Sequence, residues 1–272
     1  MTVQRLNEQF VRRKVDYILE KTKQTSPPVD LLSVARFQSV RVIEFRPMLL
    51  EGSMDVASGG FKIYLGANSF HSMETDDDPD LTNLKPRQRF ALAHEIIHTF
   101  FYDTSTDPPL LMKKLPKLPI LERLCQLGAS QLLLPERLLA QEFKVDKTLS
   151  PRRVVELAEK YCTSTEVLIR RIDSLENLQS PNKCFILARR DESGQDAQIR
   201  AICYHYSFLP YLAKPELYSS LKQAYGSFLE DDFWDSSIWD QHVKRETCTI
   251  QIRKRPHSTQ TESFFLEMGL SF

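Results

Sequence analysis

The chain has 272 residues, of which 42% are hydrophobic and 26% charged, a composition typical of globular proteins rather than disordered ones. Its 36 basic and 36 acidic residues cancel, so net charge gives no argument for a nucleic-acid or anionic-membrane partner. No run approaches the ~20 apolar residues of a membrane span. The five cysteines are odd in number and contain no C-x-x-C pair, which argues against a disulfide framework and predicts a cytoplasmic location.

Apolar spacing and β-branched content predict an alternation of helices and short strands in the first half of the chain. The helices are expected at 3–23, 30–35, 87–103 and 120–135, and the strands within 39–68. Asp30 is expected to cap the second helix, which follows the helix-stopping Ser26-Pro27-Pro28. A proline-rich connector separates the third helix from the fourth.

The second half of the chain changes character near residue 180. Residues 150–176 predict two short helices, with Ser150 capping the first and Pro151 at its first position. After residue 183 the pattern predicts strands around one helix at 218–231. We therefore expect three segments: a domain at 1–145, a helical segment at 146–179 and a C-terminal α/β domain at 180–272.

The residues that carry chemistry are His94-Glu95-Ile96-Ile97-His98. On an α-helix, positions i and i+4 share a face, so both imidazoles can reach one tetrahedral metal. Glu95 stands beside the first ligand, where it can take a proton from a water molecule as a general base. The rest of this helix is apolar, and buried polar groups need partners of the kind that a metal supplies. The pattern predicts metal-assisted attack on a carbonyl.

A zinc hydrolase site needs a third protein ligand and one open position. No third histidine follows at the spacing of the extended H-E-x-x-H motif. Glu122 opens an apolar helix 24 residues after His98. It is favoured over Asp103 and Asp107, which would have to fold back onto the metal. Gln126, one turn after Glu122, is expected to hydrogen-bond a ligand histidine.

Two joined motifs, RFALAHEIIH at 89–98 and ERLCQLGASQLLLP at 122–135, resemble those of the ImmA/IrrE metallopeptidases. That family shows an R-F-x-x-A-H-E-x-x-H helix, then E-x-x-A/C-N/D-x-F-A-A-x-L-L-x-P. PPVDLLSVA at 27–35 resembles its usual lead-in and LAEKYCTSTEVLIRRI at 157–172 its helix-turn-helix-like tail. The resemblance covers residues 3–176.

Three positions depart from the family pattern without removing a proposed ligand. Gln126 stands where the family has Asn or Asp, and Gly128 where Phe is common. Tyr102 occupies a position where many members have a further histidine.

The resemblance implies an α+β fold. It consists of a zincin-like metallopeptidase domain with a small sheet, a helix-turn-helix-like appendage and a C-terminal α/β domain, which is GAF-like in radiation-response members. It implies a cytoplasmic endopeptidase with one Zn²⁺ per chain, held by His94, His98 and Glu122, and Glu95 as general base. Well-understood members cleave helix-turn-helix transcriptional repressors, which switches on stress, DNA-damage or mobile-element genes. Such a repressor is the expected protein partner, and no membrane partner is expected.

Two further expectations concern how a peptide would react. A group that stabilises the oxyanion is expected, and Tyr102, His71 and Tyr64 stay open as candidates. The strand that contains Lys62, Ile63 and Tyr64 is expected at a sheet edge, where an extended substrate would pair with it.

Two other functions stay open. Glu51-Gly52-Ser53-Met54 resembles the E-G-C segment of peptide deformylases, although Ser53 would replace a cysteine ligand and a hydroxyl binds metal poorly. The second alternative is a catalytically idle peptidase-like regulator that binds DNA or a protein partner. Glutamates lie among the basic residues of 150–176 and reduce the net positive charge of the segment. Packing or docking of a repressor is therefore favoured there over binding of operator DNA.

Overall fold

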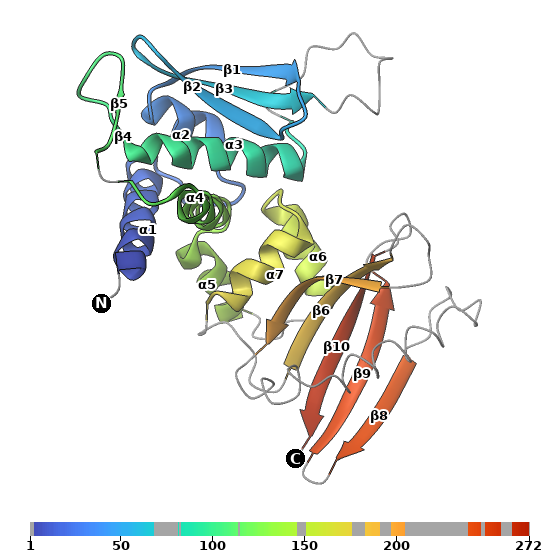
Figure 1. Ribbon diagram of the computed structural model, residues 1–272. Helices are drawn as coiled ribbons and strands as arrows, with labels where there is room; N and C mark the ends of the chain where they lie inside the picture. Colours follow the sequence, from blue (N-terminus) through green and yellow to red (C-terminus); the bar gives the residue numbers. More distant parts are fainter. Residues whose placement is uncertain are drawn as a thin grey trace. The chain divides into compact units, whose positions relative to one another are not determined.

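The computed structural model describes two compact units (Figure 1). Unit 1 comprises Met1–Leu139 and Glu159–Ser164, and unit 2 comprises Ala140–Ala158 and Thr165–Phe272. The residues described are 3–67, 81, 83–113, 115–145, 151–175, 183–190, 197–204, 239–245, 248–256 and 263–271. Within them, no helix has both the length and the apolar character needed to cross a membrane.

Unit 1 combines helices with a small sheet. Its helices are α1 (Val3–Lys21), α2 (Leu31–Phe37), α3 (Pro86–His98), the 3₁₀ turn Thr99–Phe101 and α4 (Leu118–Leu133), and α5 (Glu136–Val145) begins in it. Its strands are β1 (Val40–Pro47), β2 (Gly52–Ala57), β3 (Gly60–Ala67), β4 (Tyr102–Asp103) and β5 (Leu110–Leu111). Figure 1 shows α3 running across one face of the three-stranded sheet, with α4 packed on its other side.

The four helices expected in unit 1 are present, but the one expected at 87–103 ends at His98, where the 3₁₀ turn and then β4 follow. The ends of the helices follow local chemistry. Asp30 caps α2, because its carboxylate accepts hydrogen bonds from the backbone N–H groups of Leu32 at 3.0 Å and Ser33 at 3.2 Å. The sequence pattern did not predict α5, which follows directly after Pro135. The same proline starts α5, because its carbonyl accepts the first bonds of that helix, from Leu138 and Leu139.

The sheet corrects one expectation about the substrate. Its strand order is β1-β3-β2, with β3 parallel to β1 and antiparallel to β2. Lys62, Ile63 and Tyr64 therefore lie in the central strand, and the prediction that they form a free edge is wrong. The cause is β2, which turns back at Ser58-Gly59 to pair with β3 although its sequence, GSMDVA, carries little strand signal.

One face of β3 builds the core of unit 1. Phe61, Ile63 and Leu65 are fully buried and alternate toward the helices. Tyr64 points to the opposite face, where the guanidinium of Arg46 lies 3.6 Å from its ring centroid. The sheet thus has an apolar face toward the helices, and α3 packs against this face.

α4 lies close to α1 and α3 at Gly128. A Cβ at this position would lie 2.8 Å from Cγ1 of Val11 in α1 and 2.9 Å from Cγ2 of Ile97 in α3. A glycine inside a helix costs about 1 kcal/mol relative to alanine. Here it allows α4 to lie close against α3, which bears the two histidines of the motif.

Unit 2 contains most of α6 (Pro151–Lys160), α7 (Thr165–Asp173) and a five-stranded sheet. The strands are β6 (Lys183–Arg190), β7 (Ala197–Tyr204), β8 (Trp239–Arg245), β9 (Cys248–Pro256) and β10 (Ser263–Ser271). All neighbours pair antiparallel, in the order β7-β6-β10-β9-β8. The helix expected at 218–231 lies outside the described residues, and β8 was not expected from the sequence.

The three segments expected from the sequence, with a boundary near residue 180, stay a prediction. Within unit 2, α7 lies against β7 of the five-stranded sheet. The chain as a whole is a mixed α+β protein.

Candidate metal centre

α3 presents two imidazoles to one point. Nε2 of His94 lies 3.1 Å from Nε2 of His98, one turn further along the helix. The two side chains are 16% and 18% exposed. Ala93, Ile96 and Ile97, on the other sides of α3, are fully buried, which fixes the rotation of the helix about its axis.

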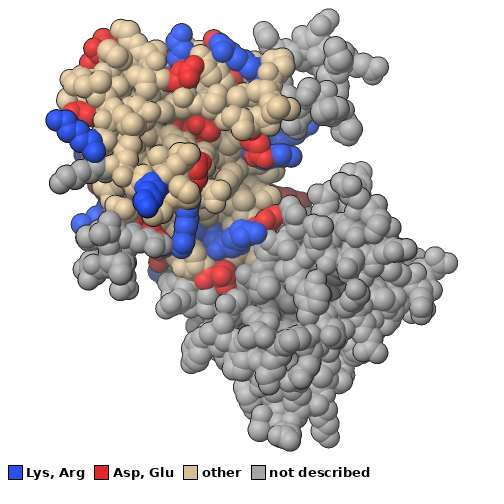
Figure 2. Space-filling model, viewed as in Figure 1, with Lys and Arg blue, Asp and Glu red and all other residues tan. Residues whose placement is uncertain are grey.

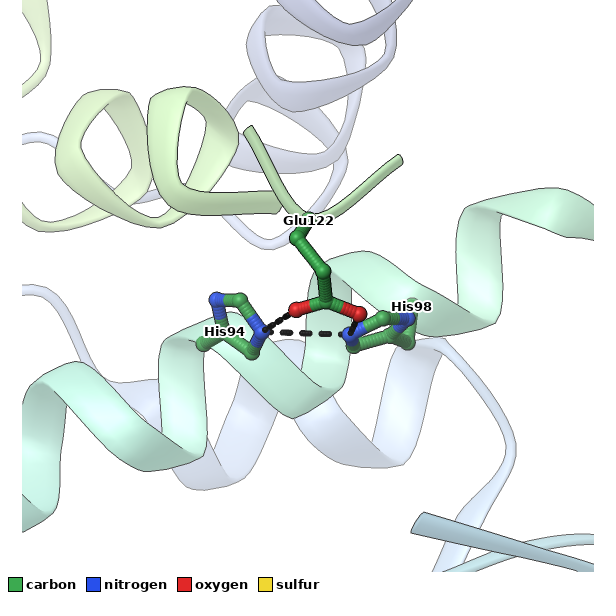
Figure 3. Close-up of side chains that lie close together, drawn as sticks. All are labelled: His94, His98 and Glu122. Carbon is green, nitrogen blue, oxygen red and sulfur yellow. Dashed lines mark hydrogen bonds and ion pairs between the residues drawn. The ribbon is translucent and has the colours of Figure 1, made fainter. Parts of the chain in front are cut away.

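Glu122 reaches the same point from the first half of α4. Its Oε2 lies 3.2 Å from Nε2 of His94, and its Oε1 lies 3.6 Å from Nε2 of His98 (Figure 3). The structure therefore brings together the three residues predicted as ligands. The two alternatives lie elsewhere: Asp103 accepts hydrogen bonds from Ser105, and Asp107 accepts from the backbone N–H of Gly59.

The three side chains lie close enough together to hold one metal ion. Within the described part of the chain, one ligand atom from each of them lies within 4.8 Å of the others. Zinc bonds of about 2.0–2.2 Å at tetrahedral angles place two ligand atoms about 3.3–3.6 Å apart. The separations of 3.1, 3.2 and 3.6 Å are near that value, and the two that involve Glu122 are to different oxygens of its carboxylate. Three protein ligands would leave a fourth position open, as catalytic zinc sites require.

The electrostatics of the site also suit a cation. Burial lowers the pKa of both His94 and His98, and Glu122 opposes this shift. The imidazoles are therefore neutral near pH 7, the form that binds metals. Glu95 is 8% exposed, and burial, with a smaller contribution from the charge of Glu122, raises its pKa to about 7. A carboxyl with a pKa near neutrality is suited to proton transfer.

The centre opens into a cleft of about 660 Å³, a size typical of ligand sites. Three elements line it. The lining residues are Leu50, Glu51 and Gly52 at the start of β2, Phe90, Ala91, His94, Glu95 and His98 in α3, and Glu122 and Gln126 in α4. Leu50 was not predicted as part of the site, and Glu51 and Gly52 were noted only in the segment that resembles the E-G-C segment of peptide deformylases, because local patterns do not reveal which loop lies over a distant helix.

The other predicted site residues have different positions. Gln126 is exposed on the cleft wall, and no hydrogen bond joins it to either histidine among the described residues. Tyr102 does not line the cleft; its ring packs edge-on against Phe61, at 5.3 Å between centroids. Tyr64 lies on the sheet face that points away from α3, and His71 lies outside the described residues.

Three arginines of the helix-turn-helix-like segment are paired or buried within unit 2. Arg153 pairs with Glu142 at 3.0 Å, and Arg170 pairs with Glu166 at 3.0 Å. Arg171 is 2% exposed. On the face drawn in Figure 2, basic and acidic side chains of the described residues are interspersed. These contacts support the expectation that the segment serves packing more than binding of a phosphate backbone.

Comparison with known proteins gives a likeness in fold. No protein-family model matches the chain, and no curated protein matches it. A solved structure described as a Mycobacterium tuberculosis transcriptional regulator is similar over 99% of this chain and 81% of that chain, with a TM-score of 0.50 and 11% sequence identity. At that identity the likeness concerns the fold alone.

Proposed function

We propose that this chain is a zinc-dependent endopeptidase of the ImmA/IrrE type, with a zincin-like catalytic domain, that cleaves a regulatory protein such as a helix-turn-helix repressor in the cytoplasm. The observation that carries the proposal is the convergence of His94, His98 and Glu122, whose ligand atoms lie within 4.8 Å of one another, with Glu95 buried beside them. Two imidazoles and one carboxylate form the ligand set of well-known zinc peptidases.

The residues of the centre divide the chemical work. Zinc, when bound, polarises the scissile carbonyl and acidifies the attacking water. His94, His98 and Glu122 hold the ion. Glu95 accepts the proton of the attacking water and then gives it to the leaving amine, a cycle that a pKa of about 7 favours.

The walls of the cleft support a peptide as substrate. β2 is an outer strand of the described sheet, and its first residue lines the cleft. An extended peptide that pairs with the free side of β2 would run past the histidines. Leu50, Phe90 and Ala91 provide apolar surface beside the centre, which suits an apolar side chain of the substrate.

The sheet of unit 2 is proposed as a sensory, GAF-like domain. The support is its organisation as a separate compact unit with a five-stranded antiparallel sheet, to which α7 adds a helix.

The test uses the zinc-loaded protein and purified helix-turn-helix repressors encoded in the same genome, with products identified by mass spectrometry. Glu95→Gln should keep zinc and lower the rate of cleavage by about 10²–10⁴-fold, the usual contribution of a general base. Glu44→Gln is the matched control, because this exposed β1 carboxylate pairs with Arg46 and does not line the cleft. Undiminished cleavage by Glu95→Gln refutes the role of Glu95, and absence of cleavage by the wild type refutes the peptidase.

The fold likeness to a transcriptional regulator favours one second candidate, a regulator with an idle peptidase-like domain. Salt-dependent DNA binding that survives Glu95→Gln, without proteolysis of any partner, would support it. Arg153 and Arg170 each pair with a glutamate of this chain, and Arg171 is buried. These contacts weigh against DNA binding by this segment.

A further inference from the structure

We propose that Gly52 is a positioning residue for Glu95, because the absence of a side chain at position 52 creates the space that holds the carboxylate. The inference rests on the proposed function, in which Glu95 is the general base.

Gly52 faces α3 from the start of β2. It pairs with Leu65 of β3, a fully buried residue on the face of the sheet that carries the helices. Residues paired across antiparallel strands point to the same face, so a side chain at position 52 would also point toward α3. The next residue, Ser53, pairs with Tyr64 and points away from α3.

The contact between Gly52 and Glu95 is tight. A Cβ at position 52 would lie 3.0 Å from both Cγ and Oε1 of Glu95 and 3.4 Å from its Cδ. Carbon atoms pack best at about 3.5–4.0 Å, so a methyl group here would push the carboxylate by about half an ångström. Because Glu95 is 8% exposed, the open direction for that movement is the cleft.

The backbone does not itself require glycine at this position. Among the described glycines, positive φ angles occur at Gly59 and Gly60, and Gly52 has a conformation that other residues adopt readily. The requirement for glycine therefore comes from the neighbouring carboxylate. This distinction makes the inference testable by removing that carboxylate.

The first measurement is a double-mutant cycle in melting temperature, on the full chain in zinc-saturated buffer with zinc occupancy checked by mass spectrometry. Gly52→Ala should lower Tm by about 3 °C in the wild type and by less than about 1 °C in a Glu95→Ala background, where the contact is gone. Ser53→Ala, which faces the other way, should change Tm equally in both backgrounds. An equal decrease for Gly52→Ala in both backgrounds would overturn the inference.

The second measurement is kinetic and uses the cleavage assay of the repressor. Gly52→Ala should lower kcat by about 10–100-fold through misplacement of the base, leave KM within about twofold, and keep full zinc occupancy. An unchanged kcat, or a change in KM alone, overturns the positioning role. If the wild type cleaves nothing, the proposed function fails, and the melting cycle still decides whether Gly52 holds Glu95 in place.

Discussion

Glu95 has surroundings that disfavour a charged carboxylate. It is 8% exposed, lies near the charge of Glu122, and has Gly52 against its Cγ and Oε1 atoms. Desolvation disfavours the charged form of such a group. The energetic cost of placing a carboxyl there is the kind of feature that marks functional sites more often than structural ones.

This placement predicts a pH-dependent stability of the metal-free protein. Burial raises the pKa of Glu95 from its ordinary 4.5 to about 7, so its contribution to stability is complete below pH 4.5 and is lost as the pH rises through 7. Glu95→Gln, which stays neutral, should therefore raise the Tm of EDTA-treated protein by several degrees at pH 8, since the shift corresponds to about 3 kcal/mol. The gain should be small at about pH 4.5. An increase in Tm that is the same at both pH values would show that ionisation of Glu95 does not destabilise the folded protein.

At the scale of residues, the sequence allowed the ligands to be predicted but not their surroundings. His94 and His98 follow from helical spacing, and Glu122 follows from its place at the start of an apolar helix. Leu50 gave no local signal, and Gly52 was noted only within the deformylase-like segment. Their position beside the candidate centre depends on how β2 and the residues before it pack against α3.

Gly128 shows the same principle at the scale of elements. On propensity alone, Gly128→Ala should stabilise α4 by about 1 kcal/mol. The structure predicts the opposite, a loss of about 1–3 kcal/mol, because the methyl group would collide with Val11 and Ile97. Thermal or urea unfolding measures the difference. Gln126→Ala is the control, because it adds helix propensity at an exposed site of the same helix. A Gly128→Ala variant that is as stable as the wild type would contradict the close packing of α4.

Strand pairing is the other place where local patterns were insufficient. The alternation of core-facing and outward-facing residues in 61–65 predicts a strand correctly, but it does not show whether that strand is central or at an edge of the sheet. β3 is the central strand because β2, whose sequence shows little strand pattern, pairs with it. The edge available to a peptide consequently moves to β2, whose first residue lies on the cleft.

In the molecule as a whole, the candidate metal centre lies entirely within unit 1, since the three residues that could hold the ion come from α3 and α4. Bound zinc should therefore stabilise that unit, by about 2.7 kcal/mol at a free zinc concentration 100 times Kd. Hydrogen exchange measured with zinc and with EDTA should show slower exchange in 86–98 and 118–133 when zinc is present. The strands β6 to β10 should exchange at the same rate in both conditions. Equal exchange in 86–98 with and without zinc would contradict the site.

Native mass spectrometry of the purified chain measures whether His94, His98 and Glu122 hold one zinc ion, as we propose. We expect about one zinc per chain in the wild type and in Glu95→Gln, and a sharp loss of zinc in Glu122→Ala. A wild type that takes up no zinc when the metal is supplied, or a Glu122→Ala variant that retains it fully, would refute the proposed zinc site.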